Sequence, residues 1–296
     1  MPSVPSIFPL LITGPTASGK SAYALERAAE CPSVIINADS MQVYRDLRVL
    51  SARPSPEDQV GVAHALYGTV DGAEAYSAGR FVREVAAELA RARDEGRRPV
   101  IVGGTGLYFM ALLEGLSPVP GIPEDVRAHW RGEAERLGAA GLHAVLADRD
   151  PEMGAVLRPS DPQRVTRALE VLEATGVSLG VWQRTPGEPV IEAERCERVV
   201  IAPERAELYA RADARFDAML AGGALEEVVQ LAARGLDSGL PVMRALGVPQ
   251  LLQHIRGETG LEAAVAAAKM ETRRYIKRQM SWIKRNMISW TYVSET

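Results

Sequence analysis

The chain has few of the residues that build disulfides and metal centres. It contains two cysteines, Cys31 and Cys196, which lie far apart in the sequence and form no C-x-x-C pattern. The four histidines show no spacing typical of metal ligands; they are His64, His129, His143 and His254. We therefore expect free thiols and structural histidines rather than a disulfide framework or a cysteine- or histidine-based metal site.

Other absences exclude whole classes of protein. No apolar run is long enough to span a bilayer, and residues 1–9 lack the basic stretch of a signal peptide. We therefore expect a cytoplasmic protein with no membrane partner, and we expect it to be a monomer. Aromatic residues make up only 5% of the chain and the net charge is −4, so nucleic acid would need a local basic patch. The guanine-recognition pattern N-K-x-D is absent, which argues against a GTPase.

Lysine is also scarce, and one of the few lysines lies in the most informative motif. Residues 14–21 read G-P-T-A-S-G-K-S, a complete G-x-x-x-x-G-K-S phosphate loop that contains Lys20. A strand-like run at 7–13 precedes it and an amphipathic helical pattern at 22–30 follows, which favours a phosphate loop over a chance glycine-rich turn. Loop N–H groups can bind a diphosphate, and the Ser21 hydroxyl can bind Mg²⁺. The candidate diphosphate-binding residues are Gly14, Thr16, Ala17, Ser18, Gly19, Lys20 and Ser21.

The apolar pattern predicts an α/β fold with an inserted helical domain. Strand-like runs alternate with helical patterns up to residue 116, which is typical of a parallel sheet flanked by helices. Three prolines in residues 117–123 indicate a linker, and the next fifty residues read as helical. We predict a catalytic core from residues 1–120 and 196–296, and an all-helical insertion from 121–195. The expected elements are strands at 34–37, 100–102 and 195–202, and helices at 80–95, 205–221, 224–234, 249–256 and 261–286.

Two further segments follow predicted strands and should lie at the same sheet edge as the phosphate loop. Residues 37–44 contain Asp39, which could bind Mg²⁺, act as a general base or cap a helix. Residues 103–108 read G-G-T-G-L-Y and allow either close approach of a ligand or a tight turn.

Arginine and lysine cluster on two predicted helices. Arg164 and Arg167 share a face of a helix capped by Asp161, where they either bind RNA phosphates or are solvated. The last helix carries a broad basic side, which is the kind of local patch that nucleic acid would need. That side comprises Lys269, Arg273, Arg274, Lys277, Arg278, Lys284 and Arg285.

Taken together, these segments resemble the tRNA dimethylallyltransferase (tRNA isopentenyltransferase) family. The matching segments span almost the whole chain: 14–21, 39–44 with Arg53 and Pro54, 75–78, 103–108 with 111–116, 161–170, 213–220 and 272–282. The resemblance implies a phosphate-loop core and a helical insertion that grips the anticodon stem-loop of tRNA. It implies transfer of a dimethylallyl group from dimethylallyl diphosphate to the exocyclic amine of the adenine 3′ of the anticodon.

The resemblance also implies roles for individual residues. Asp39 resembles the general base, Lys20 and Arg215 would stabilise the leaving pyrophosphate, and Ser21 would hold Mg²⁺. Residues resembling tRNA contacts are Asp39, Ser40, Met41, Gln42, Thr105, Gln163, Arg164, Val165, Thr166, Arg167, Arg244, Arg274, Lys277 and Arg278. The chain departs from the family pattern R-x-x-G-Y-R-Q, because Val248 and Pro249 replace its aromatic and basic residues.

Three other functions fit part of the sequence. A phosphate-loop kinase would use Lys20, Ser21 and Asp39 but would leave the basic last helix without a role. A transferase acting on free AMP would need neither that helix nor the insertion. A non-catalytic RNA-binding protein would not need an intact loop together with Asp39 and Arg215.

Overall fold

The computed structural model describes residues 8–294, and its core is a parallel sheet of six strands. The strands lie in the order β3-β2-β4-β1-β5-β6, and every neighbouring pair is parallel. This confirms the predicted α/β class. The strands are β1 (Leu10–Thr13), β2 (Ser33–Asn37), β3 (Ala63–Ala65), β4 (Arg98–Gly103), β5 (Glu197–Ile201) and β6 (Thr291–Val293).

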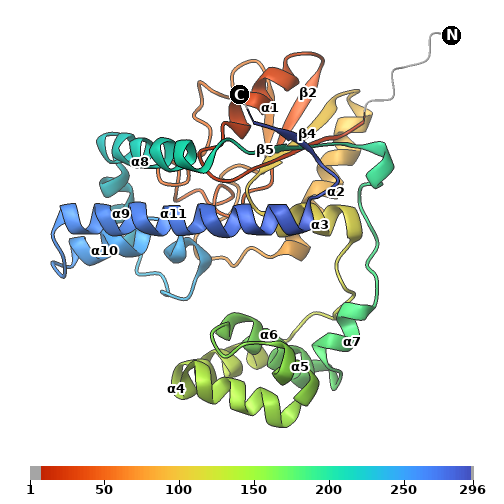
Figure 1. Cartoon of the computed structure of the whole chain (residues 1–296), viewed down its shortest axis with the longest axis vertical. Coiled ribbons are helices and arrows are strands. Elements are labelled where there is room, and N and C mark those ends of the chain that lie inside the picture. Colours follow the sequence, from red (N-terminus) through yellow and green to blue (C-terminus); the bar gives the residue numbers. More distant parts are fainter. Residues whose placement is uncertain (1–7, 295–296) are drawn as a thin grey trace. The chain divides into compact units, whose positions relative to one another are not determined.

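The helices agree closely with the expected pattern in the core, where α8 and α11 have the predicted bounds (Figure 1). The helices of the core are α1 (Lys20–Ala28), α2 (Ala78–Asp94), α3 (Gly106–Glu114), α8 (Arg205–Ala221), α9 (Ala224–Ala233), α10 (Val248–Ile255) and α11 (Leu261–Asn286). Residues 1–7, which include the start of the predicted first strand and most of the segment expected not to be a signal peptide, lie outside the described residues.

Side-chain alternation along the strands builds a core on each face of the sheet. Leu10 and Ile12 of β1 pack with Ala24 and Ala28 of α1, whereas Leu11 packs with residues of α2 and α3 on the other face. The end of α11 joins this second face through Ile283. The central strands β1, β2 and β4 are mostly apolar because helices cover both faces of the sheet. Consequently, the carboxyl ends of β1, β2 and β4 meet at one edge of the sheet.

Residues Glu114–Pro189 form a separate compact unit. The predicted boundaries at 121 and 195 lie a few residues further along the chain. The core of this unit includes Trp130, Leu142, Leu146 and Leu169, all of which are buried. Its helices are α4 (Glu124–Arg149, interrupted at Gly138), α5 (Pro151–Val156), α6 (Pro162–Thr175) and α7 (Leu179–Arg184). Across residues 8–294, no helix combines the length and apolar character needed to cross a membrane.

Gly103, at the end of β4, leaves no room for a side chain. A Cβ atom there would lie 2.1 Å from the backbone carbonyl carbon and oxygen of Ala38. We expect Gly103→Ala to lower the free energy of unfolding by about 3 kcal/mol, because backbone atoms rather than a flexible side chain would have to move. Urea unfolding followed by circular dichroism measures this change. Gly79→Ala in α2, where the nearest atom would be 3.8 Å away, is the control and should not destabilise.

Candidate active site

The phosphate loop connects the buried end of β1 to the N-terminus of α1. Gly19 is the N-cap residue of α1 with φ 91°, and no side chain caps the helix, so its first N–H groups are available to an anion. Gly14 is required at the start of the loop, because a Cβ there would lie 2.4 Å from the Ile201 carbonyl oxygen. The loop therefore needs glycine at Gly14, and the helix start that follows it is open to an anion. The predicted diphosphate residues Thr16, Ala17 and Ser18 lie within this loop, between Gly14 and Gly19.

Lys20 lies near a second cation, Arg215, and near one carboxylate, Asp39. Burial lowers the pKa of Lys20 to about 8; the positive charge of Arg215 acts in the same direction and the negative charge of Asp39 opposes both. The Lys20 Nζ donates to the Pro15 carbonyl oxygen at 3.2 Å. This excess of positive charge in a partly buried place favours binding of an anion.

Arg215 projects from α8 and lies half-buried. Within residues 8–294, no hydrogen bond or ion pair engages its guanidinium group, and burial lowers its pKa. A desolvated cation without a carboxylate partner costs stability, and its guanidinium group is available to bind an anion. Asp213 and Asp217 on the same helix do not pair with it, because they bind Arg273 and Lys269 of α11 instead.

The two carboxylate oxygens of Asp39 have different surroundings. Oδ1 accepts backbone N–H groups of the following turn, and Oδ2 faces the turn after β4. Its Oδ1 accepts the Met41 N–H at 2.9 Å, and its own N–H donates to the Asn37 Oδ1 at 2.9 Å. Its Oδ2 would lie 3.5 Å from a Cβ on Gly104, in the turn after β4. The helix-cap interpretation is therefore wrong, because no helix follows β2 and Oδ1 closes a turn instead. Oδ2 remains available for a second task.

Thr105 joins the turn after β4 to the segment that follows Asp39. Its Oγ1 accepts the Ser40 N–H at 3.0 Å and lies 3.3 Å from the Ser40 hydroxyl. The Gln42 amide group donates to the carbonyl oxygens of Ser51 and Ala52. The predicted site residues of these two segments thus lie together beside Asp39.

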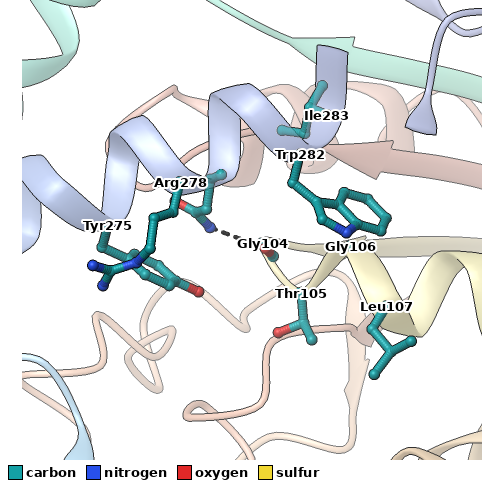
Figure 2. A pocket seen from close by; sticks show the side chains of 9 residues that line it. Gly104, Thr105, Gly106, Leu107, Tyr275, Arg278, Trp282 and Ile283 are labelled. Carbon is teal, nitrogen blue, oxygen red and sulfur yellow. Dashed lines mark hydrogen bonds between the residues drawn. The ribbon is translucent and has the colours of Figure 1, made fainter. Parts of the chain in front are cut away.

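A cavity of about 230 Å³ opens beside the turn after β4, and α11 forms its other wall. Figure 2 shows the Tyr275 phenol and the Trp282 indole directed from α11 toward this turn. Burial, followed by the charge of Asp39, raises the pKa of Tyr275, so its hydroxyl stays protonated. Sequence reasoning missed Tyr275, Gln279 and Trp282, although all three lie within the matching segment 272–282. The lining residues are Gly104, Thr105, Gly106, Leu107, Tyr275, Arg278, Gln279, Trp282 and Ile283.

The basic side of α11 is narrower than the sequence predicts. Lys269 lies 2.6 Å from Asp217, and Arg273 pairs with Asp213, so these two cations bind α8. Arg274, Lys277 and Arg278 are exposed, as a nucleic-acid contact requires. Arg274 and Arg278 also pair with Glu271 of the same helix, and Lys284 and Arg285 are exposed. The predicted basic side is therefore restricted to the cations from residue 274 onward.

One apolar residue in the predicted RNA-contact segments is a core residue. Val165 is fully buried within the helical unit, so its side chain cannot reach RNA, whereas its neighbours Gln163 and Arg164 are exposed. Asp161 caps α6 by accepting the Arg164 N–H, as predicted. Thr166 and Arg167 follow on α6 and are partly exposed.

In the segment that departs from the family pattern, residues 244–250, packing accounts for Val248. Val248 is fully buried against the core around α9 and α10, while Arg244 and Pro249 are exposed. Pro249 lies in the first turn of α10, where its missing N–H has no helical partner to lose. Of the two residues that replace the family's aromatic and basic residues, Val248 is thus explained by its packing in the core.

The residues around Ser21 suit Mg²⁺ only if a ligand supplies most of its oxygens. The Ser21 side chain is exposed in the first turn of α1. In the part of the chain that the structure describes, no three acidic, histidine or cysteine side chains gather as a metal site. One hydroxyl together with diphosphate oxygens and water is a donor set that Mg²⁺ accepts, so the site fits a metal that arrives with its anion.

Comparisons with known proteins agree on one family. The sequence model of IPP transferase matches residues 42–286, and that of isopentenyl transferase matches residues 9–69. The tRNA dimethylallyltransferase of Bradyrhizobium sp. (strain ORS 278) is 53% identical over 96% of this chain and 92% of its own. That of Azorhizobium caulinodans is 52% identical over 95% of this chain and 90% of its own.

Solved structures are similar as well. The tRNA isopentenylpyrophosphate transferase of Bacillus halodurans superposes with a TM-score of 0.70 at 30% identity, covering 97% of this chain and 90% of its own. A eukaryotic dimethylallyltransferase described as acting on tRNA gives 0.79 at 26% identity, covering 93% of this chain and 69% of its own. By sequence, by fold and by the residues of its phosphate loop, the chain belongs to the IPP transferase family, with tRNA dimethylallyltransferases among its relatives.

Proposed function

We propose that the protein transfers a dimethylallyl group from dimethylallyl diphosphate to the exocyclic amine of the adenine 3′ of the anticodon in tRNA, releasing pyrophosphate. The observation that carries this proposal is the place of Lys20 at the carboxyl edge of the sheet, where it lies near both the Arg215 cation and the Asp39 carboxylate. Two cations can stabilise the negative charge of a leaving diphosphate, and one carboxylate can accept the proton that an amine loses. The printed names of the relatives support the same reaction.

In the proposed reaction, the adenine nitrogen forms a bond to the first carbon of the dimethylallyl group. The bond from that carbon to the diphosphate oxygen breaks, and its electron pair leaves with pyrophosphate. Asp39 accepts the proton that the amine loses. Lys20, Arg215 and the loop N–H groups stabilise the growing negative charge without rearranging, because they are already in place. Mg²⁺ held by Ser21 would add positive charge at the diphosphate.

The acceptor must leave the base stack to reach this site, since an adenine inside a stacked loop cannot present its amine. We propose that the anticodon stem-loop is held by residues of both compact units. The core contributes exposed cations on α11 and the residues beside Asp39, and the helical unit contributes α6. The proposed tRNA contacts are Ser40, Met41, Gln42, Thr105, Gln163, Arg164, Thr166, Arg167, Arg244, Arg274, Lys277 and Arg278. We further expect the enzyme to act as a monomer in the cytoplasm.

Incubation with labelled dimethylallyl diphosphate and unmodified tRNA, followed by nucleoside analysis, tests the proposal. We expect label in a single modified adenosine next to the anticodon. Parallel reactions with free AMP and with ATP separate the alternatives: preferential labelling of AMP indicates a nucleotide transferase, and ATP consumption without transfer indicates a kinase. Either result would replace the function proposed here.

The lowered pKa of Lys20 predicts how donor use depends on pH. Below about pH 8, Lys20 carries the positive charge that attracts the diphosphate; above this value the free enzyme loses it. We expect kcat/KM for dimethylallyl diphosphate to fall as pH rises above about 8, about tenfold per pH unit at the limit. Bound diphosphate favours the charged lysine, so kcat should fall only at higher pH. Initial rates from pH 6 to 10 at saturating tRNA measure both parameters.

A further inference from the structure

We propose that Gln279 of α11 is a positioning residue that holds the phosphate loop against the turn after β4, and so sets how the donor's leaving group faces Asp39. Its side chain lies 8% exposed and joins two segments that are distant in sequence. The inference rests on the proposed function, because it concerns the geometry of that same site. It goes beyond the proposed function by assigning a task to a residue whose two hydrogen bonds are to backbone groups of the protein.

The Gln279 carboxamide forms one hydrogen bond to each segment. Its Oε1 accepts the Thr16 N–H of the phosphate loop at 2.9 Å, and its Nε2 donates to the Gly104 carbonyl oxygen at 2.9 Å (Figure 2 shows the second bond). An N–H group requires an acceptor and a carbonyl oxygen requires a donor, so only a side chain with both can bridge them. The backbone thereby determines the orientation of the amide group.

Gly104 is the point at which the donor site and the base meet. A Cβ on this residue would lie 2.7 Å from the Gln279 Nε2, 3.5 Å from the Asp39 Oδ2 and 3.6 Å from the Gly14 carbonyl oxygen. The carboxamide, the proposed base and the first residue of the phosphate loop therefore border one small space. A shift of Gln279 would change the separation between the loop and Asp39.

The helix that carries Gln279 is firmly packed. Ile276 and Ile283, on the same side of α11, are buried in the core. Trp282 covers Gly106 so closely that a Cβ there would lie 2.1 Å from its Cζ3 atom. A side chain on a rigid element holds its partners more accurately than one on a loop. Because Gln279 occupies the Thr16 N–H, the diphosphate must take its backbone hydrogen bonds from other residues of the loop.

The test compares Gln279→Met, which removes both hydrogen bonds at similar size, with Gln279→Glu, which keeps an acceptor for Thr16 and loses the donor to Gly104. For both variants we expect the KM for dimethylallyl diphosphate and the Kd for pyrophosphate to rise about tenfold, with kcat also falling about tenfold. The Kd for tRNA should stay within twofold. Met270→Ala, at an exposed residue of the same helix, is the control and should leave all four values unchanged.

The outcomes separate a positioning role from a structural one. Loss of stability alone lowers the active fraction and the thermal midpoint but leaves both the KM for the donor and the Kd for pyrophosphate unchanged. That pattern, or wild-type kinetics in both variants, would overturn the inference. If the unaltered enzyme bound no pyrophosphate and transferred no dimethylallyl group, the proposed function itself would fail, which is a distinct result.

Discussion

Replacing Asp39 with asparagine should lower kcat by at least about 10²-fold while leaving the affinities for tRNA and pyrophosphate nearly unchanged. Asparagine has the same shape, and its oxygen can still accept the Met41 N–H that Asp39 Oδ1 accepts at 2.9 Å. The local turn should therefore persist. The amide group that takes the place of Oδ2 cannot accept a proton, so only the proton transfer is lost.

Single-turnover rates with preformed enzyme–tRNA complex and saturating donor measure this effect without interference from product release. Asp94→Asn, at an exposed position near the end of α2, is the matched control and should react at the wild-type rate. A single-turnover rate for Asp39→Asn equal to that of the control would remove Asp39 from the role of general base.

Replacing Arg215 with alanine should lower kcat by about 10² to 10³-fold, the range seen when one donor to a developing anion is removed. The expected effect on stability has the opposite sign to that of most arginine deletions. Because no carboxylate within residues 8–294 pairs with the guanidinium group, its removal leaves no buried charge unpaired and relieves a desolvated cation. The thermal midpoint should stay the same or rise.

The same substitution should move the pH dependence. The charge of Arg215 lowers the pKa of Lys20, so its removal should raise that pKa above its value of about 8 and shift the alkaline decline of kcat/KM to higher pH. Arg211→Ala, which breaks an exposed pair with Glu207 on the same helix, is the control for both measurements. A lowered thermal midpoint together with wild-type turnover would show that Arg215 serves the fold and not the leaving group.

Local patterns in the sequence determine much of the fold. The G-x-x-x-x-G-K-S loop needs only one strand and one helix to form, so its position between β1 and α1 could be predicted. The long helices α8 and α11 carry enough periodic residues to predict their bounds. The strands β3 and β6 were missed because each has only three residues and lies at a sheet edge, where no long apolar run is required.

What the sequence could not reveal is which distant side chains meet. Gln279 contacts a loop residue 263 positions away, and no local pattern encodes such a pairing. In the sequence, Arg273 and Lys269 resemble RNA-binding cations. In the structure they form ion pairs with Asp213 and Asp217 of α8. Val165 lies between predicted RNA-contact residues in the sequence, but its side chain is buried in the core of the helical unit. Tertiary structure thus decides between residues that local sequence cannot distinguish.

The most direct test of the account is a crystal structure of the enzyme with an unreactive thio analogue of dimethylallyl diphosphate and an anticodon stem-loop. We expect the diphosphate to lie across the loop at 14–21, in contact with Lys20 and Arg215. The amine of the flipped adenine should lie within hydrogen-bond distance of the Asp39 Oδ2. An RNA base bound away from this edge of the sheet, or a diphosphate bound elsewhere, would contradict the account.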